Sequence, residues 1–206
     1  MKTKKELRKE ILQLRDALPL EERREKSHQI AEQVIAQKEF IEADKVLLFA
    51  SYHSEVETSE IFEAALEANK DIYYPKVMGN EMEFFQVECE ADLLEGYRGI
   101  REPEGNQEKQ FRPSATDKIC IIMPGAVFDE VGNRIGYGGG YYDKYLQKLE
   151  YFFAKEVKKN TSPLYKIAVA FACQLVAIGE IENQVYDIKP NYIVTEKCKF
   201  LNLTKH

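Results

Sequence analysis

The stretch from Met123 to Asp143 holds the residues best suited to chemistry in this 206-residue chain. An apolar run, Ile119 to Met123, leads into it and predicts a short buried strand. A helix is predicted after it, because apolar residues recur at helical spacing on one face: Tyr142, Tyr145, Leu146 and Leu149. A strand, a glycine-rich loop and a helix start, in that order, present backbone N–H groups and the positive end of a helix to an anion.

Two well-known phosphate motifs do not fit this loop. The P-loop needs Lys and then Ser or Thr after its last glycine, but Tyr141 follows Gly140. The dinucleotide fingerprint needs a glycine at its sixth position, and counting from Gly136 that position is also Tyr141. A plain turn and an anion site both remain open. We favour phosphate binding, because adjacent glycines cost conformational entropy and Arg134 supplies a charged fork.

The whole stretch also carries a long family pattern. It reads Pro124-x-x-x-Phe128-Asp129-x-x-Gly132-x-Arg134-x-Gly136-x-Gly138-Gly139-Gly140-Tyr141-Tyr142-Asp143. This run resembles the signature of the 5-formyltetrahydrofolate cyclo-ligase family, also called methenyltetrahydrofolate synthetases. Shorter segments elsewhere are similar to the family too: Lys4-Lys5-x-Leu7-Arg8, Glu55-x-Glu57-Thr58, Gly99-Ile100-x-Glu102-Pro103, Gln174, Asp187, Ile193 and Thr195. The resemblance therefore spans residues 4 to 195, nearly the whole chain.

The resemblance implies an activity and a set of site residues. The implied reaction is the ATP-dependent closure of 5-formyltetrahydrofolate to 5,10-methenyltetrahydrofolate, with release of ADP and phosphate and a requirement for Mg²⁺. The implied ATP-binding residues are Lys4, Arg8, Arg134, Ile135, Gly136, Tyr137, Gly138, Gly139, Gly140, Tyr141 and Tyr142. Arg134, Tyr141 and Tyr142 are the implied catalytic residues, and Asp143 and then Asp187 the implied magnesium ligands. The implied substrate-binding residues are Ala50, Tyr52 and Glu55.

Each assignment has a plainer alternative. Lys4 and Arg8 lie four residues apart on one helical face, which suits a polyphosphate but also an ordinary solvated face. Asp143 could simply be an acid that the helix dipole favours, and Asp187 a surface acid. The two tyrosines after Gly140 could both be core residues. We expect Tyr142 to be the more buried of the two.

Glu55 lies in a loop that is well placed for a ligand. The apolar run Val46 to Ala50 is typical of a parallel strand covered on both faces, and the loop 51–57 follows it. Thr58 then caps a predicted helix that runs to about Ala68, and another strand follows at 70–75. In such β-α-β units ligands bind outside the carboxyl ends of the strands. A carboxylate there can accept the paired N–H and amino groups of a pterin, and Tyr52 and His53 could line the same pocket.

The remaining elements complete an α/β pattern. Helices are expected at 3–18, with Leu7, Ile11, Leu14 and Leu18 inward, and at 20–37. Further strands are expected at 81–87 and 166–171, and a linker loop at 151–163. We predict one domain over residues 1–206: a mostly parallel open sheet flanked by helices, in a Rossmann-like three-layer arrangement, with its cleft at the carboxyl ends of the strands.

Composition narrows the remaining possibilities. The net charge of −6 argues against a general nucleic-acid binder. The four cysteines contain no CxxC spacing, so no zinc site is indicated. The charged start resembles no signal peptide and no apolar stretch could span a bilayer, so we expect a cytoplasmic monomer that binds no membrane. Its expected partners are ATP and 5-formyltetrahydrofolate, with or without a polyglutamate tail.

Three positions depart from the usual family pattern: Gly179, where proline is common, Tyr186, where histidine is common, and Asn191, where an acid is common. These departures give some support to a non-catalytic nucleotide- or folate-binding protein. A small-molecule kinase is the second alternative, since it would use the same kind of phosphate loop.

Overall fold

The computed structural model describes residues 2–156, 164–182 and 187–201. Within them, seven strands form the main sheet, in the order β12-β11-β9-β6-β1-β2-β3. The central strands β11, β9, β6, β1 and β2 are parallel, and the edge strands β12 and β3 are antiparallel to their neighbours. The mostly parallel α/β sheet predicted from the sequence is therefore confirmed. The strand bounds are β1 Lys45–Leu47, β2 Asp71–Met78, β3 Glu81–Gln86, β6 Ile119–Met123, β9 Leu164–Val169, β11 Tyr192–Val194 and β12 Lys199–Leu201.

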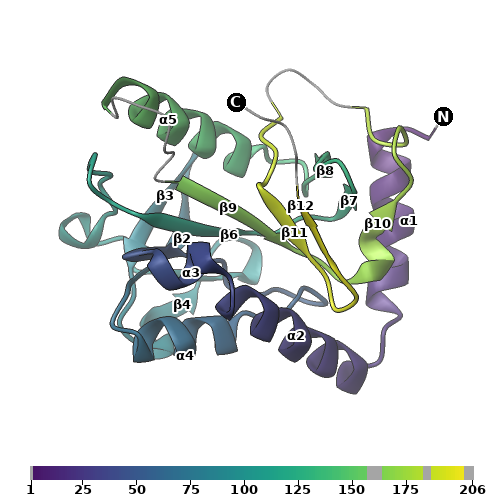
Figure 1. The fold of residues 1–206 in the computed structure, drawn as a ribbon, viewed down its shortest axis with the longest axis horizontal. Coiled ribbons are helices and arrows are strands. Elements are labelled where there is room, and N and C mark those ends of the chain that lie inside the picture. The colour runs from purple at the N-terminus through teal and green to yellow at the C-terminus, as the bar shows by residue number, and fades with distance from the viewer. Residues whose placement is uncertain (1, 157–163, 183–186, 202–206) are drawn as a thin grey trace.

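Helices cover both faces of this sheet (Figure 1). One face carries α5 (Tyr141–Glu156), and the other carries α2 (Leu20–Ile35), α3 (Lys38–Glu42) and α4 (Ser59–Glu67). Side chains alternate between the faces of a strand, so in β6 Ile121 packs in the cluster with α5 whereas Ile122 packs in the cluster with α2, α3 and α4. Burial on both faces explains why this strand is apolar throughout.

A smaller unit stands beside the main sheet. Helix α1 (Lys4–Asp16) begins at a capping box formed by Thr3 and Glu6. Its residues Leu7 and Ile11 pack against a three-stranded sheet of β7 (Val127–Asp129), β8 (Arg134–Ile135) and β10 (Leu175–Val176). Figure 1 shows α1 standing next to these strands, at the end of the molecule away from α3. This packing brings the N-terminal helix to the glycine-rich loop that follows β8.

The other described elements are short. Strands β4 (Leu93–Glu95) and β5 (Arg101–Pro103) form an antiparallel hairpin. The 3₁₀ turns are η1 (Glu90–Asp92), η2 (Tyr97–Gly99), η3 (Gln107–Lys109) and η4 (Ala172–Gln174). Turn η2 forms the tip of the β4–β5 hairpin, and its Tyr97 and Arg98 reach the cleft described below.

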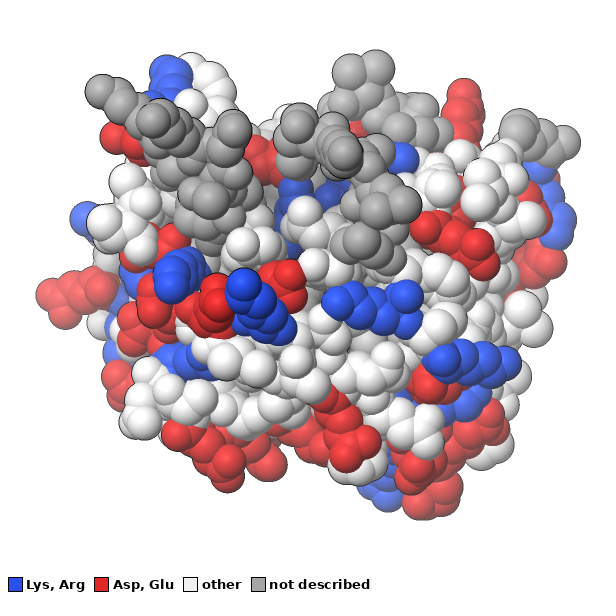
Figure 2. Space-filling model, in the orientation of Figure 1, with Lys and Arg blue, Asp and Glu red and all other residues white. Residues whose placement is uncertain are grey.

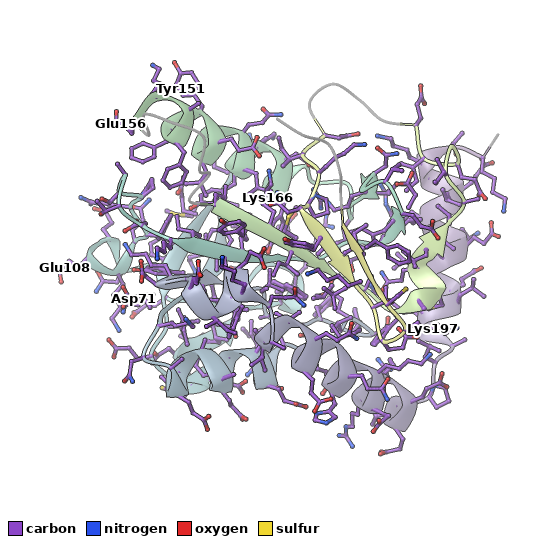
Figure 3. The ribbon with its side chains drawn as sticks, in the orientation of Figure 1. Asp71, Glu108, Tyr151, Glu156, Lys166 and Lys197 are labelled. Carbon is purple, nitrogen blue, oxygen red and sulfur yellow. The ribbon has the colours of Figure 1, made fainter. Side chains whose placement is uncertain are left out.

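Two expectations about the helices were wrong. Leu14 was expected to face inward, but it is 51% exposed, and Arg15 is buried instead. Arg15 follows Leu7 and Ile11 at intervals of four, so helical geometry places it on the buried side. The linker expected from residue 151 is also wrong over 151–156, because α5 continues to Glu156 with Phe153 buried (Figure 3 labels Tyr151 and Glu156 on its end). Residues 157–163 of that expected linker lie outside the described residues.

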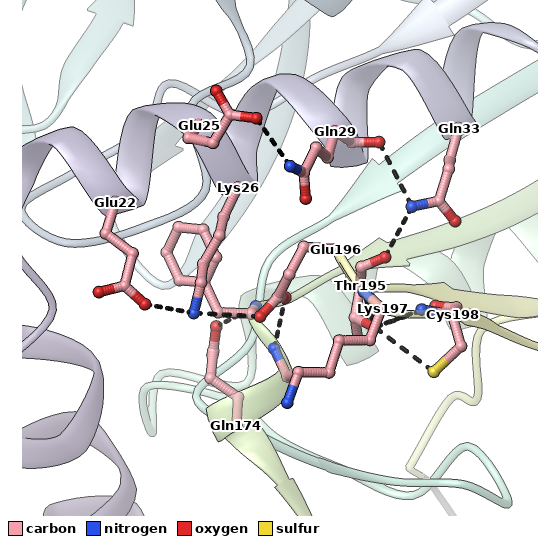
Figure 4. Close-up of polar contacts among 12 residues, drawn as sticks. Glu22, Glu25, Lys26, Gln29, Gln33, Gln174, Thr195, Glu196, Lys197 and Cys198 are labelled. Atoms are coloured by element: carbon pink, nitrogen blue, oxygen red, sulfur yellow. Dashed lines mark hydrogen bonds and ion pairs between the residues drawn. The ribbon is translucent and has the colours of Figure 1, made fainter.

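Polar contacts join α2 to the segment after β11 (Figure 4). Lys26 forms ion pairs with Glu22 at 2.7 Å and with Glu196 at 3.2 Å. Glu196 also accepts the N–H of Ala172, and Gln33 donates to the carbonyl of Thr195. The helix is thereby tied to the end of the sheet where the parallel strands terminate.

Acidic and basic side chains are interspersed over the face drawn in Figure 2. Among the described residues, none of the helices combines the length and the apolar character needed to cross a bilayer.

Candidate active site

A cleft of about 910 Å³ opens at the carboxyl ends of the parallel strands. Strand β1 pairs with β2 on one side and with β6 on the other, and the chain continues from β6 to β9, so the topology reverses between β1 and β6. Phe49 and Ala50, beyond β1, and Pro124, beyond β6, line the cleft. Such switch points are where open α/β sheets bind ligands. The predicted position of the cleft is therefore confirmed.

The glycine-rich loop forms one wall of this cleft. Gly136 through Gly140 all line it, and residues 137–140 are exposed. Gly138 has a φ of +103° and Gly140 a φ of +65°, which side-chain-bearing residues rarely adopt. The loop therefore faces open space with its backbone accessible, as an anion-binding loop requires.

A buried aspartate builds the turn before this loop. Asp129 has no exposed surface, and its carboxylate accepts the N–H of Val131 and both the N–H and the side-chain amide of Asn133. Together with Gly132, at a φ of +84°, these bonds close the turn between β7 and β8. Asp129 thus sets the point at which Arg134 enters the cleft.

Arg134 is clamped between the strand end and the helix start. Its Nη2 lies 2.7 Å from Oδ1 of Asp143, and its Nη1 donates to the carbonyl of Pro124 at 3.3 Å. The same Asp143 oxygen accepts the N–H of Ile188 at 3.3 Å. Arg134 is only 8% exposed, yet it lines the cleft. The guanidinium is therefore held in a single orientation beside the glycine loop.

The two predicted cations of α1 reach the same region. Arg8 donates from Nε to the carbonyl of Gly136 at 2.7 Å. Lys4, one turn earlier, lies 3.0 Å from Asp187. Because Ile188 contacts Asp143, the segment that contains Asp187 lies against the start of α5. The structure therefore brings both α1 cations and both predicted acids to the glycine loop. Ile135 is buried against α1, so only its backbone faces this region.

At the start of α5 the hydroxyl of Tyr142 is more buried than that of Tyr141, as expected. The hydroxyl of Tyr142 is buried with no partner among the described residues, and burial strongly raises its pKa. The ring of Tyr141 lies 6.5 Å from that of Tyr97, across the mouth of the cleft. Loss of solvent and the nearby Tyr97 raise the pKa of Tyr141. Both tyrosines line the cleft.

Glu55 is half-buried in the same cleft, beside the glycine loop, where its carboxyl accepts a hydrogen bond from the Tyr137 hydroxyl. Its Oε2 accepts the N–H of Tyr52 at 3.0 Å. Burial raises the pKa of the Glu55 carboxyl, and a hydrogen bond from the Tyr137 hydroxyl and the charge of Arg15 partly oppose that rise. The predicted substrate residues Ala50 and Tyr52, and His53 with them, also line the cleft.

Comparison with known proteins identifies the family. Residues 1–196 match the sequence model of the 5-formyltetrahydrofolate cyclo-ligase family. The chain belongs to this family. It is 30% identical to the 5-formyltetrahydrofolate cyclo-ligase of Escherichia coli K12, over 90% of this chain and 96% of that protein. It is also 30% identical to the probable 5-formyltetrahydrofolate cyclo-ligase of Schizosaccharomyces pombe, over 84% and 85%.

Solved structures show the same relationship. The 5,10-methenyltetrahydrofolate synthetase of Aquifex aeolicus is 31% identical and superposes with a TM-score of 0.77, covering 98% of this chain and 94% of that one. The synthetase of Mycoplasma pneumoniae, 24% identical with a TM-score of 0.69 over 95% and 99%, supports the fold.

Some cleft residues were missed by the sequence reasoning. Arg15 donates from Nε to Ser54 at 2.9 Å and from Nη1 to the Tyr137 hydroxyl at 2.6 Å. The sequence signal that could have revealed Arg15 is its spacing, because it follows Leu7 and Ile11 at intervals of four residues and so lies on the buried side of the helix. Glu102, in a family-like segment, is buried and accepts the N–H of Val77 at 3.2 Å. Thr58 does precede α4, but its hydroxyl bonds the Phe49 carbonyl instead of capping the helix.

Two of the three departures from the family pattern can be placed. Asn191 accepts the N–H of Lys166 at 2.8 Å, so the residue in place of an acid helps to join β9 to the segment before β11 (Figure 3 labels Lys166 on β9). Gly179 has a φ of +92°, which proline cannot adopt, so the turn there has a conformation of its own. Tyr186 lies outside the described residues.

Proposed function

We propose that this protein is an ATP-dependent ligase that closes 5-formyltetrahydrofolate to 5,10-methenyltetrahydrofolate, releasing ADP and phosphate. One observation carries the proposal beyond family membership: a glycine loop with a fixed arginine and the half-buried carboxyl group of Glu55 line one cleft. The first suits a triphosphate and the second suits a pterin ring.

The chemistry explains why both ligands must share the cleft. The formyl oxygen is a poor leaving group, so direct loss of water is slow. Transfer of the γ-phosphoryl group from ATP to that oxygen leaves ADP and makes the oxygen a good leaving group. The 10-nitrogen then attacks the formyl carbon and loses its proton, and the oxygen departs within phosphate. Such a reaction depends mainly on positioning and on stabilising charge.

On the nucleotide side, Arg134 and the loop do the main work in this proposal. The N–H groups of residues 136–140 donate hydrogen bonds to the phosphate oxygens, and Arg134, Lys4 and Arg8 neutralise the phosphate charge. The orientation of Arg134 is set in advance by Asp143, which lowers the cost of ordering it on binding. Tyr141, at the mouth, and the unpartnered hydroxyl of Tyr142 are placed to contact the transferring group or the formyl oxygen.

The acids near the loop suit a magnesium ion. Asp143 and the segment of Asp187 lie together, and both offer carboxylate oxygens. Magnesium usually takes one or two carboxylates together with phosphate oxygens and water. The ion would neutralise charge on the phosphates, with Asp143 as the main protein ligand and Asp187 as the second.

On the folate side, Glu55 accepts the N–H and amino group of the pterin, and Ala50 and Tyr52 shape its pocket. Tyr52 helps in two ways, since its N–H binds Glu55 and its ring lies at the cleft wall. A cytoplasmic location, a monomeric state and a single functional unit over residues 1–206 remain predictions.

The decisive experiment is an absorbance assay. Protein, 5-formyltetrahydrofolate and Mg-ATP are mixed, and the ultraviolet absorbance of the methenyl product is followed. We expect steady product formation that stops when ATP is left out. A non-catalytic binding protein would bind both ligands without a signal. A small-molecule kinase would produce ADP and a stable phosphoester without ring closure.

The magnesium assignment has its own test. In Asp143→Asn the carboxylate becomes an amide, so the magnesium concentration that gives half-maximal rate should rise several-fold. Lys144→Gln, an exposed neighbour on α5, serves as the control. An unchanged magnesium dependence in Asp143→Asn would refute the ligand assignment.

A further inference from the structure

Four arginines line the described part of the cleft, and the guanidinium groups of two of them form no hydrogen bond or ion pair with another described side chain. The four are Arg15, Arg23, Arg98 and Arg134. Arg134 is held by Asp143, and Arg15 is hydrogen-bonded to Ser54 and Tyr137. In the described part of the chain, the arginines that form ion pairs are Arg24, Arg101 and Arg134. Arg23 and Arg98 are therefore uncommitted cations in a protein of net charge −6.

Both uncommitted arginines flank one turn at the rim of the cleft. Arg23, on α2, donates from Nη1 to the carbonyl of His53 at 3.1 Å. The backbone carbonyl of Arg98, in η2, accepts a hydrogen bond from the Tyr52 hydroxyl at 2.9 Å. The rings of Tyr52 and His53 pack together with their centroids 3.9 Å apart. Arg23 thus contacts the Tyr52–His53 turn through its guanidinium group, whereas Arg98 contacts it through its backbone carbonyl and its guanidinium lines the same cleft.

The positions of these arginines are specified by the fold. Arg98 has a φ of +58°, which is uncommon for a residue with a side chain, and its guanidinium lies over the Tyr97 ring at 5.1 Å. The Nε of Arg23 is buried and has no partner among the described residues. A backbone strain and an unsatisfied buried donor both cost free energy, and such costs are found most often at binding sites.

The turn also connects the rim to the pterin end of the site. Tyr52 donates its N–H to the Glu55 carboxylate and its hydroxyl to the Arg98 carbonyl, so one residue links Glu55 to the segment that carries Arg98. A folate has the matching polarity: hydrogen-bond donors on the pterin at one end, and the carboxylates of glutamate at the other. The phosphate cations Arg134, Lys4 and Arg8 lie instead around the glycine loop.

We propose that Arg23 and Arg98 bind the carboxylates of the glutamyl end of the folate substrate. This inference rests on the proposed function, because it assigns the far end of the same substrate. Guanidinium groups suit carboxylates because both are planar forks that can form paired hydrogen bonds. Since the site lies at the open rim, it leaves room for further glutamyl residues, and each of them adds a carboxylate near these cations.

The test compares substrates that differ only at that end. Wild-type protein, Arg23→Gln and Arg98→Gln are assayed with 5-formyltetrahydropteroate, which lacks glutamate, and with the mono- and triglutamate forms of 5-formyltetrahydrofolate. Arg24→Gln is the matched control, because Arg24 is the next residue of α2, is largely exposed, pairs with Glu21 and does not line the cleft. Glutamine preserves much of the side-chain length but removes the charge.

We expect each cleft variant to raise KM for the monoglutamate about 5- to 20-fold, with the effect weakening at high salt. The effect on kcat should be much smaller. The increase in KM should shrink toward that of Arg24→Gln when the pteroate is the substrate. It should be larger with the triglutamate than with the monoglutamate. The KM for ATP should match that of the control.

Two results would overturn the inference. Equal increases in KM for the pteroate and for the glutamate-bearing substrates would show that the arginines do not bind the glutamyl carboxylates. A raised KM for ATP, with the folate KM unchanged, would assign them to phosphate. If the wild-type protein shows no turnover, the proposed function fails separately. Equilibrium binding of the same three compounds to the same variants then still decides whether the arginines bind the tail.

Discussion

At the scale of single residues, the site depends on charges that are held in place before any ligand arrives. Arg134 is 8% exposed and bonded to both Asp143 and the Pro124 carbonyl. A cation fixed in this way can stabilise developing charge without reorganising, which is the main source of electrostatic catalysis. The same fixation makes the site sensitive to the shape of the side chain as well as to its charge.

Removing the arginine should therefore reduce turnover more than stability. For Arg134→Ala we expect kcat to fall by about 10²-fold or more, while the circular dichroism spectrum stays that of the wild type. The exposed Arg112→Ala, remote from the cleft lining, is the control and should behave as wild type. Undiminished turnover of Arg134→Ala would show that the guanidinium has no part in the reaction.

The half-buried carboxyl of Glu55 gives a prediction about pH dependence. Burial raises its pKa above the ordinary 4.5, so the group resists ionisation in the free protein. Pterin binding needs the ionised form, so KM for the folate should fall as the pH rises from 4.5 through the raised pKa, while KM for ATP changes less. In Glu55→Gln this pH dependence should disappear, and KM should be raised about 10- to 100-fold.

The stability effect of Glu55 has the opposite sign. A carboxyl with a raised folded-state pKa contributes stability below its unfolded-state pKa, and that contribution is lost as the pH rises through the folded-state pKa. At neutral pH, urea unfolding should therefore show Glu55→Gln to be at least as stable as the wild type. A variant that is less stable at pH 7, yet keeps the wild-type pH dependence of KM, would contradict both expectations.

At the scale of elements, function depends on a loop whose conformation glycine alone tolerates well. Gly138 has a φ of +103°, outside the left-handed helical region, whereas Gly140 at +65° lies within it. A Cβ at Gly138 would also lie 3.8 Å from the Arg8 guanidinium, whereas one at Gly140 would meet nothing within 4 Å. An alanine at Gly140 would therefore have only the modest cost of the left-handed conformation. An alanine at Gly138 would have the larger cost of a backbone conformation outside that region.

Alanine substitutions at these two glycines should therefore differ in their effects on stability and on ATP binding. Gly140→Ala should lose about 1 kcal/mol of unfolding free energy. Gly138→Ala should lose more and also raise KM for ATP, since the loop must shift where it faces the phosphates. Thermal unfolding and ATP titrations measure the two effects. If Gly140→Ala proved the more damaging of the two for ATP binding, the loop would not bind phosphate as proposed.

At the scale of the whole molecule, distant parts of the chain are joined around the carboxyl ends of the strands. Lys26 on α2 pairs with Glu196, which follows β11 and also accepts the Ala172 N–H next to η4 (Figure 4). The side chain of Glu196 is only 6% exposed and that of Lys26 20%. Removing the partner of a largely buried carboxylate leaves its charge uncompensated, which is costly.

Lys26→Met should therefore destabilise the protein by about 1–3 kcal/mol, measured by urea unfolding. Lys38→Met removes a pair with Glu42 in which the lysine is 78% exposed, so its effect should be close to zero. Equal effects of the two substitutions would mean that burial does not matter for the Lys26–Glu196 contact.

The sequence by itself determined the class of fold, the glycine loop and the family. These features are local: strand and helix periodicity, and the need for positive φ at glycine, act over a few residues and can be read directly. The tertiary structure alone decided how the local pieces meet. Arg15 contacts Ser54 across 39 residues and Tyr137 across 122, and Arg23 and Arg98 come to one rim from separate elements. Such contacts depend on how α1, α2 and the β4–β5 hairpin pack, which no short stretch of sequence specifies.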